Sequence, residues 1–293
     1  MAATMSAGAS NTDSRSRTLH LFILLLPGML IIAFCLILPV GWLFRMSFNL
    51  TIDGSVIKEG FTLGHYYGFL TDAFRLRIAW NSFLLSTVVT LTTLILTYPI
   101  ALFLYRWNSP WRNILVVLTI SPLLVSSVVR TFGWMLILGD NGWLNSGLRS
   151  LGLLTTPIRL TNNFTGIVIA LTEVLMPVMA LALIAGFGRL DHIYEEAAAS
   201  LGATPLKVFL RVTLPLSLPG VALGCMLCFV QAISSFITPQ LLGGGRVFLV
   251  ATEIYDTAMI TLNWPLSAAI SMLLLAALIL ALFVYGRMTR SVE

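Results

Sequence analysis

The sequence predicts an all-α integral membrane protein with six transmembrane helices and a polar helical hairpin between the fourth and the fifth. Hydrophobic residues make up 58% of its 293 residues and charged residues only 10%, and its mean hydropathy is +0.94. Soluble domains carry about 25% charged residues, so this composition is typical of a membrane protein. The formal net charge is +5, but the basic residues stand singly between apolar runs. That spacing argues against nucleic-acid binding and for a role in setting membrane orientation.

The apolar runs define the domain organisation. Residues 1–18 are rich in Ser, Ala, Thr and Asn and lack a hydrophobic face, so we expect a disordered tail. The run 19–44 is too long for a signal peptide and has no small-residue cleavage site, which favours an uncleaved first transmembrane helix. Residues 19–293 are therefore expected to form a single transmembrane domain. Its other spans, each long enough for the ~20 residues that cross a bilayer, are 78–104, 114–138, 165–187, 216–237 and 265–285.

Positive charges in the connections indicate the orientation. With six spans, both termini, the second connection and the polar hairpin lie on the same side of the membrane. The basic residues of that side are Arg15, Arg17, Arg106, Arg112, Arg189, Lys207, Arg211, Arg287 and Arg290. The longer loops of the other side carry basic residues too, so the bias is modest, but it favours a cytoplasmic location for both termini and the hairpin.

The hairpin occupies about residues 188–215. Asp191 is suited to cap a helix over 192–201, with Glu195 and Glu196 near its positive end. Gly202 can adopt the left-handed conformation that ends such a helix.

A second short helix is expected after this turn. Thr204 would be its N-cap and Pro205 its first residue, and Pro215 would stop it. The small residues 197–199 would let another protein approach closely. Such a hairpin suits docking better than catalysis.

The same stretch resembles a signature of the permease subunits of ATP-driven, binding-protein-dependent importers. That family carries Glu-Ala-Ala, three residues, Gly, nine residues, a branched aliphatic, one residue and Leu-Pro. Here the pattern falls on Glu196, Ala197, Ala198, Gly202, Val212, Leu214 and Pro215, with Val for the more usual Ile. The resemblance implies that this loop, with Glu195 beside the motif, sits in a groove of a cytoplasmic ATPase. It also implies that the loop transmits closure of the ATPase to the membrane helices.

The sequence offers no catalytic residue, cofactor site or metal site of its own. A phosphate-binding P-loop needs Gly-Lys, and neither Lys58 nor Lys207, the two lysines of the chain, follows a glycine. The three cysteines lie in apolar runs, and the three histidines are far apart. We therefore expect ATP to be bound by a partner subunit.

Two ionisable residues lie inside predicted spans. Arg130 in the third span and Glu173 in the fourth both lie about 12 Å from the outer ends of their helices, at 1.5 Å per residue. Such residues usually face a partner or a water-filled path, so we hypothesise an ion pair between adjacent helices. The pair could be purely structural or could lie beside the translocation path.

Other polar and aromatic residues are candidates for the same path. Trp134 and Asp140 lie near the outer end of the third span, where aromatic and carboxylate groups could hold an amine cation or mark the membrane interface. The break at 234–245 predicts a gate, a re-entrant turn or a loop that docks an outer binding protein. Phe236 lies in that break, and Gln231 precedes it, either on the path or in an interhelical hydrogen bond.

Several further stretches are similar to the spermidine/putrescine branch of these permeases. They are 129–134 (VRTFGW), 139–142 (GDNG), 236–244 (FITPQLLGG) and 263–265 (NWP). The resemblance implies a bacterial inner-membrane complex with a second, different permease, two ATPase copies and an extracytoplasmic binding protein, surrounded by lipid. It implies a polyamine or a related small solute as cargo. Two other interpretations stay open: an ion-coupled secondary transporter, and a membrane scaffold that transports nothing.

Overall fold

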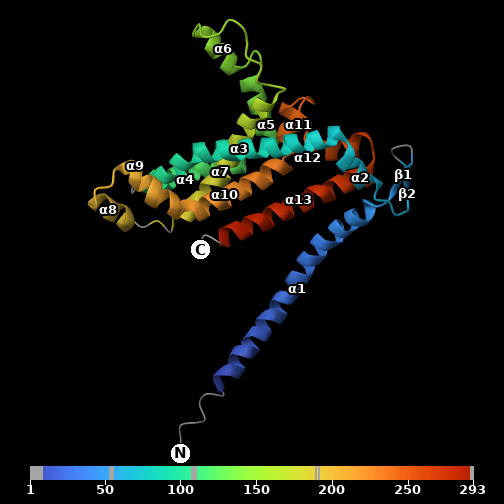
Figure 1. Cartoon of the computed structure of the whole chain (residues 1–293), viewed down its shortest axis with the longest axis horizontal. Coiled ribbons are helices and arrows are strands. Elements are labelled where there is room, and N and C mark those ends of the chain that lie inside the picture. The colour runs from blue at the N-terminus through green and yellow to red at the C-terminus, as the bar shows by residue number, and fades with distance from the viewer. Residues whose placement is uncertain (1–8, 53–55, 107–110, 189, 191, 291–293) are drawn as a thin grey trace, which may run out of the picture.

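The computed structural model describes residues 9–52, 56–106, 111–188, 190 and 192–290 and is almost entirely helical (Figure 1). Five of its helices are long and apolar enough to cross a membrane, and a sixth span results if one bent helix pair counts as one. This confirms the predicted all-α membrane fold. The long helices are α1 (Ala9–Met46), α3 (Ala73–Arg106), α7 (Phe164–Phe187), α10 (Leu214–Ser234) and α13 (Trp264–Arg290).

Helix α1 leaves the bundle and contacts it only where it ends, beside α13 (Figure 1). No residue of its most apolar stretch, within Leu25–Met46, is buried inside the chain. The helix begins at Ala9, so residues 9–18 are helical where we expected a disordered tail, and residues 1–8 lie outside the described part. Extending an existing helix costs little compared with nucleating one, which explains the longer helix.

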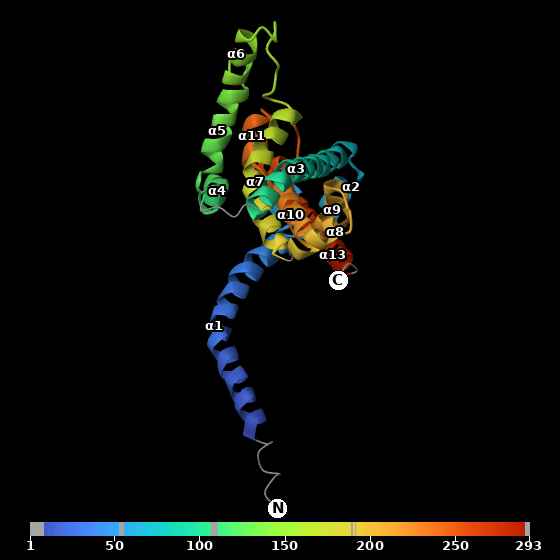
Figure 2. The same cartoon turned by 90° about the vertical axis from the view of Figure 1, so that its left-hand side faces the viewer.

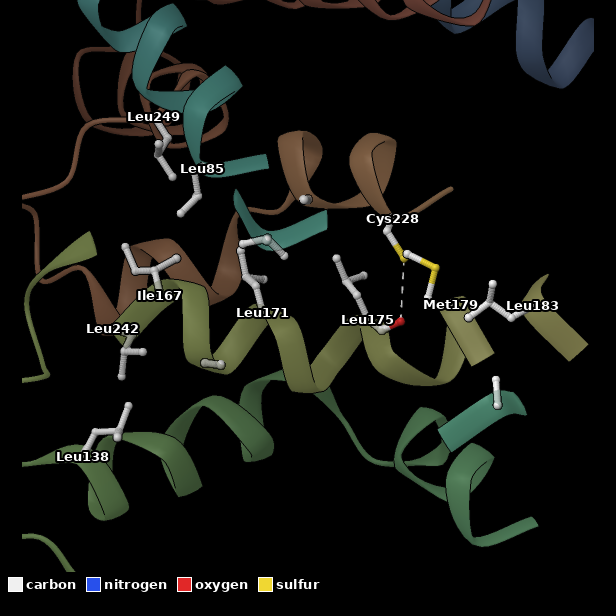
Figure 3. Close-up of a cluster of buried hydrophobic side chains, with 14 of the residues drawn as sticks. Leu85, Leu138, Ile167, Leu171, Leu175, Met179, Leu183, Cys228, Leu242 and Leu249 are labelled. Atoms are coloured by element: carbon white, nitrogen blue, oxygen red, sulfur yellow. Dashed lines mark hydrogen bonds between the residues drawn. The ribbon is translucent and has the colours of Figure 1, made fainter. Parts of the chain in front are cut away.

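The core of the bundle is formed by α3, α7 and α10 (Figure 3). Along α10, small buried residues recur at every fourth position: Gly220, Gly224, Cys228 and Ala232. This stripe packs against α7, as small residues commonly do where membrane helices approach closely. The Cys228 thiol lies 3.8 Å from the Leu175 carbonyl oxygen, to which it donates a weak hydrogen bond. Cys228 is thus part of the helix packing.

The third predicted span is not one straight helix, which corrects the expectation for 114–138. It consists of α4 (Trp111–Ile120), the 3₁₀ turn η1 (Ser121–Leu124), α5 (Ser127–Leu138) and α6 (Trp143–Ser150), with a bend of 96° after η1. Pro122 lies in that turn, and Val125 has an extended backbone, so the helix cannot run through. The three helices form an arm at one side of the bundle (Figure 2).

The end of the bundle opposite α8 (His192–Ser200) and α9 (Pro205–Val208) carries the two strands, and we call it the strand end (Figure 1). A second core cluster at this end consists of Phe69, Ile78, Val250, Leu266 and Ile270. The elements here are an antiparallel ribbon of β1 (Leu50–Ile52) and β2 (Val56–Lys58), with Thr51 opposite Ile57, and the helices α2 (Gly64–Thr71), α12 (Val250–Tyr255) and η3 (Asp256–Ile260). Helix α11 (Ile237–Leu242) packs against α5 and α7.

Glu253 on α12 gives the strand end a pH dependence. Burial raises the pKa of its carboxyl above the ordinary value of 4.5, Arg75 partly offsets this, and Asp256 and Asp72 add to it. A carboxyl whose folded-state pKa is raised stabilises the fold while it is protonated, and the contribution is lost as pH rises through that pKa. Glu253→Gln should therefore raise the thermal unfolding temperature at pH 8 and leave it unchanged at pH 4. A lower unfolding temperature at pH 8 would contradict this prediction.

Candidate functional site

The turn of the polar hairpin has the predicted geometry. Helix α8 (His192–Ser200) is followed by Gly202 with φ of +82°. The Gly202 N–H donates to the Ala199 carbonyl over 2.9 Å, and the Ala203 N–H donates to the Ala198 carbonyl over 3.1 Å. These two bonds satisfy the carbonyl groups that a helix end leaves open. The proposed N-cap, Asp191, lies outside the described residues.

The second hairpin helix differs from the prediction. Pro205 starts α9 (Pro205–Val208) after Thr204, whose side chain makes no capping hydrogen bond. The helix does not stop at Pro215, as we expected, but continues through the π-helical segment η2 (Phe209–Thr213) into α10 as one 30-residue helix. In η2 the Leu214 N–H reaches back to the Phe209 carbonyl. Pro215 lies in the first turn of α10, directly after this π-helical segment, where its missing N–H is tolerated. The hairpin is thus rigidly continuous with a membrane span.

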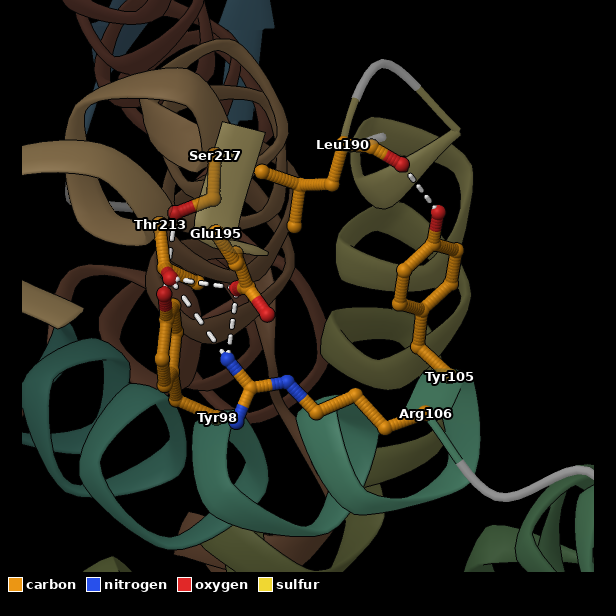
Figure 4. Close-up of polar contacts among 7 residues, drawn as sticks. All are labelled: Tyr98, Tyr105, Arg106, Leu190, Glu195, Thr213 and Ser217. Atoms are coloured by element: carbon orange, nitrogen blue, oxygen red, sulfur yellow. Dashed lines mark hydrogen bonds and ion pairs between the residues drawn. The ribbon is translucent and has the colours of Figure 1, made fainter. Parts of the chain in front are cut away.

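An ion pair fastens α8 to the bundle (Figure 4). One oxygen of the Glu195 carboxylate lies 2.6 Å from Nη2 of Arg106, the last residue of α3. The same oxygen accepts a hydrogen bond of 2.6 Å from the hydroxyl of Thr213, which is fully buried. One carboxylate therefore ties together α3, α8 and the end of η2, next to α10.

Two tyrosines of α3 add further contacts (Figure 4). The Tyr98 hydroxyl lies 2.9 Å from the Ser217 hydroxyl on α10. The Tyr105 hydroxyl donates a short hydrogen bond to the Leu190 carbonyl just before α8. Tyr98 and Tyr105 are seven residues apart, which places them on one face of the helix. This spacing at the end of a span is the one sign of the tyrosine contacts in the sequence, and the Arg106–Glu195 pair was not predicted.

The far side of the hairpin is apolar and exposed. We define its docking face as Tyr194 and Ala197 on α8, Leu201 directly after it, and Leu206 and Leu210 on the following helix. Leu201 is 89% exposed and Leu206 68%. The spacings of three and four residues keep each set on one helical face. An apolar face on a hairpin whose other side is anchored by hydrogen bonds is typical of a protein-binding surface.

Removing the charge of Glu195 should loosen the hairpin. Glu195→Gln weakens the bonds to Arg106 and Thr213. A loss of ~1 kcal/mol in the free energy of local opening corresponds to about fivefold faster amide hydrogen exchange in α8. The matched control is Glu196→Gln, because the Glu196 side chain is exposed and makes no hydrogen bond or ion pair within the described chain. We expect no change in the control. Equal exchange in both variants would refute the anchoring role.

The hypothesised intramembrane pair is present. Nη1 of Arg130 on α5 lies 3.7 Å from one carboxylate oxygen of Glu173 on α7. The other oxygen accepts a hydrogen bond of 3.3 Å from the indole N–H of Trp134. Nε and Nη1 of Arg130 are buried without a hydrogen-bond partner among the described residues. The pair is therefore incompletely satisfied within this chain.

Glu173 also faces a cavity of about 270 Å³ between α3, α4 and α7. Thr97 and Thr119 contribute hydroxyl groups to its lining, and the Thr97 hydroxyl is buried without a hydrogen-bond partner within the described chain. The Thr119 hydroxyl donates to the Leu115 carbonyl, so Thr97 supplies the unpaired hydroxyl. A carboxylate beside it inside a span is suited to hold a polar or cationic group.

The other candidate path residues do not join this group. Asp140 is exposed in the turn between α5 and α6, and Gln231 is exposed on α10. No contact in the described part of the chain connects either of them to Glu173. Phe236, in the break after α10, contacts the ring of Tyr255 at the end of α12, with ring centroids 4.5 Å apart and the planes tilted by 30°.

Solved structures share the fold of this bundle. A bacterial alginate ABC transporter, determined in complex with its alginate pentasaccharide-bound periplasmic protein, contains a chain that matches with a TM-score of 0.77 and 17% identity. The match covers 96% of this chain and 97% of that one.

The chain belongs to the family of binding-protein-dependent transport system inner membrane components, which it matches over residues 94–292. It is 33% identical to the spermidine/putrescine transport system permease protein PotB of Haemophilus influenzae, over 91% of this chain and 89% of that protein. It is 34% identical to PotB of Escherichia coli K12, over 86% of this chain and 95% of that protein. It is thus a multi-pass inner-membrane permease subunit.

Proposed function

We propose that this chain forms half of the pore of a polyamine importer and couples that pore to a cytoplasmic ATPase. The observation that carries the proposal is the hairpin, which is anchored to α3 by Glu195 and presents an apolar face outward. The similarity to two spermidine/putrescine permeases over most of the chain supports the cargo class. The other half of the pore is a second, different permease, and an extracytoplasmic binding protein delivers the cargo.

The coupling works through rigid connections. ATP binding closes the ATPase dimer and moves the docking face of each hairpin. Because the helix that begins at Pro205 continues into α10, the movement reaches the membrane span without a flexible joint. The Arg106–Glu195 pair passes it to α3 as well. Closure opens the pore to the docked binding protein, and hydrolysis resets it.

Glu173 is the acidic residue of the proposed path. An ammonium group of the cargo competes with Arg130 for the Glu173 carboxylate, and the Trp134 indole beside it favours a cation. The long separation of 3.7 Å between Arg130 and Glu173, without a hydrogen bond, makes such an exchange inexpensive.

Glu173→Gln should lower polyamine uptake about tenfold while the complex stays assembled, because the amide keeps the shape but loses the charge. Uptake into proteoliposomes, normalised to complex abundance, measures the effect. Asp140→Gln is the control, because Asp140 is exposed and has no contact with the group around Glu173. A variant that loses abundance but keeps uptake per complex would assign Glu173 a structural role only.

Mass spectrometry of the complex purified with this chain in mild detergent tests the whole proposal. We expect an ATPase, a second permease and a binding protein that retains an amine. The same subunits with another solute would move the cargo assignment and leave the mechanism intact. Gradient-driven uptake without an ATPase would favour the ion-coupled alternative, and a full complex without flux would favour the scaffold.

A further inference from the structure

A basic cleft lies at the strand end of the bundle, between the first turns of α3 and the loop that leads into α12. Its volume is about 260 Å³. Two segments that are far apart in the sequence build it, so neither alone makes the site. Its lining residues are Phe74, Arg77, Ile78, Asn81, Arg246 and Phe248.

The cleft carries two positive charges that this chain leaves unneutralised. Arg77 and Arg246 are both exposed, and no carboxylate of the described residues lies within ion-pair distance of either. Their neighbour Arg75, in contrast, lies 3.6 Å from Asp72. Asn81 adds an amide that can donate further hydrogen bonds. The residues that face this cleft therefore favour an anion.

The floor and walls of the cleft are fixed by packing. Ile78 is 1% exposed and belongs to the core cluster of the strand end. The rings of Phe74 and Phe248 meet edge to face at 5.5 Å. The loop is tied to α3 by a hydrogen bond of 2.7 Å from the Val250 N–H to the Ser82 hydroxyl. The two guanidinium groups thus stand on a rigid base, as a preorganised binding site requires.

The loop also connects the cleft to the centre of the bundle. Just before α7, the N–H of Asn162 donates to the Leu242 carbonyl over 2.8 Å, and Gly244 packs against the Asn162 side chain. Helix α7 is the most buried of the candidate spans. The cleft lies at the end of the bundle opposite the hairpin (Figure 1), which is the extracytoplasmic end if the hairpin meets a cytoplasmic ATPase.

We propose that this basic cleft receives an acidic side chain of the extracytoplasmic binding protein when that protein docks. Guanidinium groups bind carboxylates through paired hydrogen bonds, and the aromatic rings shield such a pair from water. A polycationic cargo would be repelled by the same charges, so the cleft serves docking and not cargo binding. This inference rests on the proposed function, which supplies the binding protein.

A membrane phosphate is the competing anion. Helix α3 has 34 residues and is ~51 Å long at 1.5 Å per residue, well above the ~30 Å of the hydrocarbon layer. Its first turns, with Arg75 and Arg77, belong to this excess length because charged residues avoid the hydrocarbon. Lipid phosphates lie at a similar height, just outside the hydrocarbon, and the crosslinking readout below distinguishes them from a protein carboxylate.

The test uses the complete complex in nanodiscs and the purified binding protein that supports its uptake. It measures the Kd of the binding protein for the complex. Arg77→Gln combined with Arg246→Gln should raise Kd about tenfold and flatten its salt dependence. The matched control, Arg149→Gln with Arg159→Gln, removes the same charge from two exposed residues, one in the last turn of α6 and one in the connection to α7. We expect the control to stay within about twofold of wild type.

A second readout identifies the occupant directly. A benzophenone amino acid at Phe248 should crosslink to the binding protein. Crosslinks to phospholipid, or equal losses of affinity in the test and control variants, would overturn the assignment. If the cleft variant binds with wild-type affinity and its complex still transports, the docking role of the cleft is refuted and the proposed function stands. A wild-type complex without binding-protein-dependent uptake would overturn the proposed function and this inference with it.

Discussion

Gly202→Val should abolish cargo uptake. Gly202 has φ of +82°, and nothing lies within 4 Å of the position where a Cβ would be added. A larger side chain would therefore fit, and the cost of the substitution comes from the backbone conformation. A left-handed conformation costs an ordinary residue about 1–2 kcal/mol, and a β-branched residue suits it least. The turn would open and the second hairpin helix would move relative to α8, so the docking face would no longer match its partner.

Gly202→Asn is the control for this experiment. Asparagine tolerates the left-handed region better than valine does, so uptake should be largely kept. Both variants are compared by uptake per assembled complex, with membrane abundance measured in parallel. Wild-type uptake by Gly202→Val at normal abundance would show that the hairpin turn does not determine coupling.

Gly186→Val should prevent stable assembly of the bundle. A Cβ at Gly186 would lie 2.3 Å from the Cα of Gly220, so α7 and α10 would have to separate at their closest approach. Neither backbone can yield without loss of the packing around it. Overpacking a core commonly costs 1–3 kcal/mol, and a clash with backbone is at the upper end or beyond. We expect membrane abundance to fall to about a tenth of wild type.

The matched control is Gly147→Val on α6, another helical glycine, where nothing lies within 4 Å of an added Cβ. Both substitutions carry the same change in helix propensity, so the difference between them isolates the contact of α7 with α10. Equal abundance of the two variants, measured by quantitative blotting of membranes and by thermal unfolding in detergent, would contradict the packing argument.

The sequence predicted the features that depend on local chemistry. Apolar length located the spans, and glycine chemistry located the turn at Gly202. The depths of Arg130 and Glu173 indicated their pairing, because both were counted from the same side of the membrane. These conclusions needed no knowledge of how the helices are arranged.

The missed features depend on the surroundings of a residue. Pro215 was expected to end a helix, but the π-helical turn before it absorbs the missing hydrogen bond. The bend near Pro122 was hidden inside an apolar run of ordinary length. The anchor at Arg106 joins residues 89 positions apart, and a single sequence carries no signal for such a pairing. The cleft between Arg77 and Arg246 is likewise visible only once the chain is folded.

The central claim is that the hairpin transmits the nucleotide state of an ATPase to the membrane helices. The most direct test places a benzophenone amino acid at Leu201, which is 89% exposed on the docking face, in the complete complex. We expect crosslinks to the ATPase whose positions or yields change between the nucleotide-free and the ATP-bound complex. Crosslinks that do not reach the ATPase, or that are identical in both states, would contradict it.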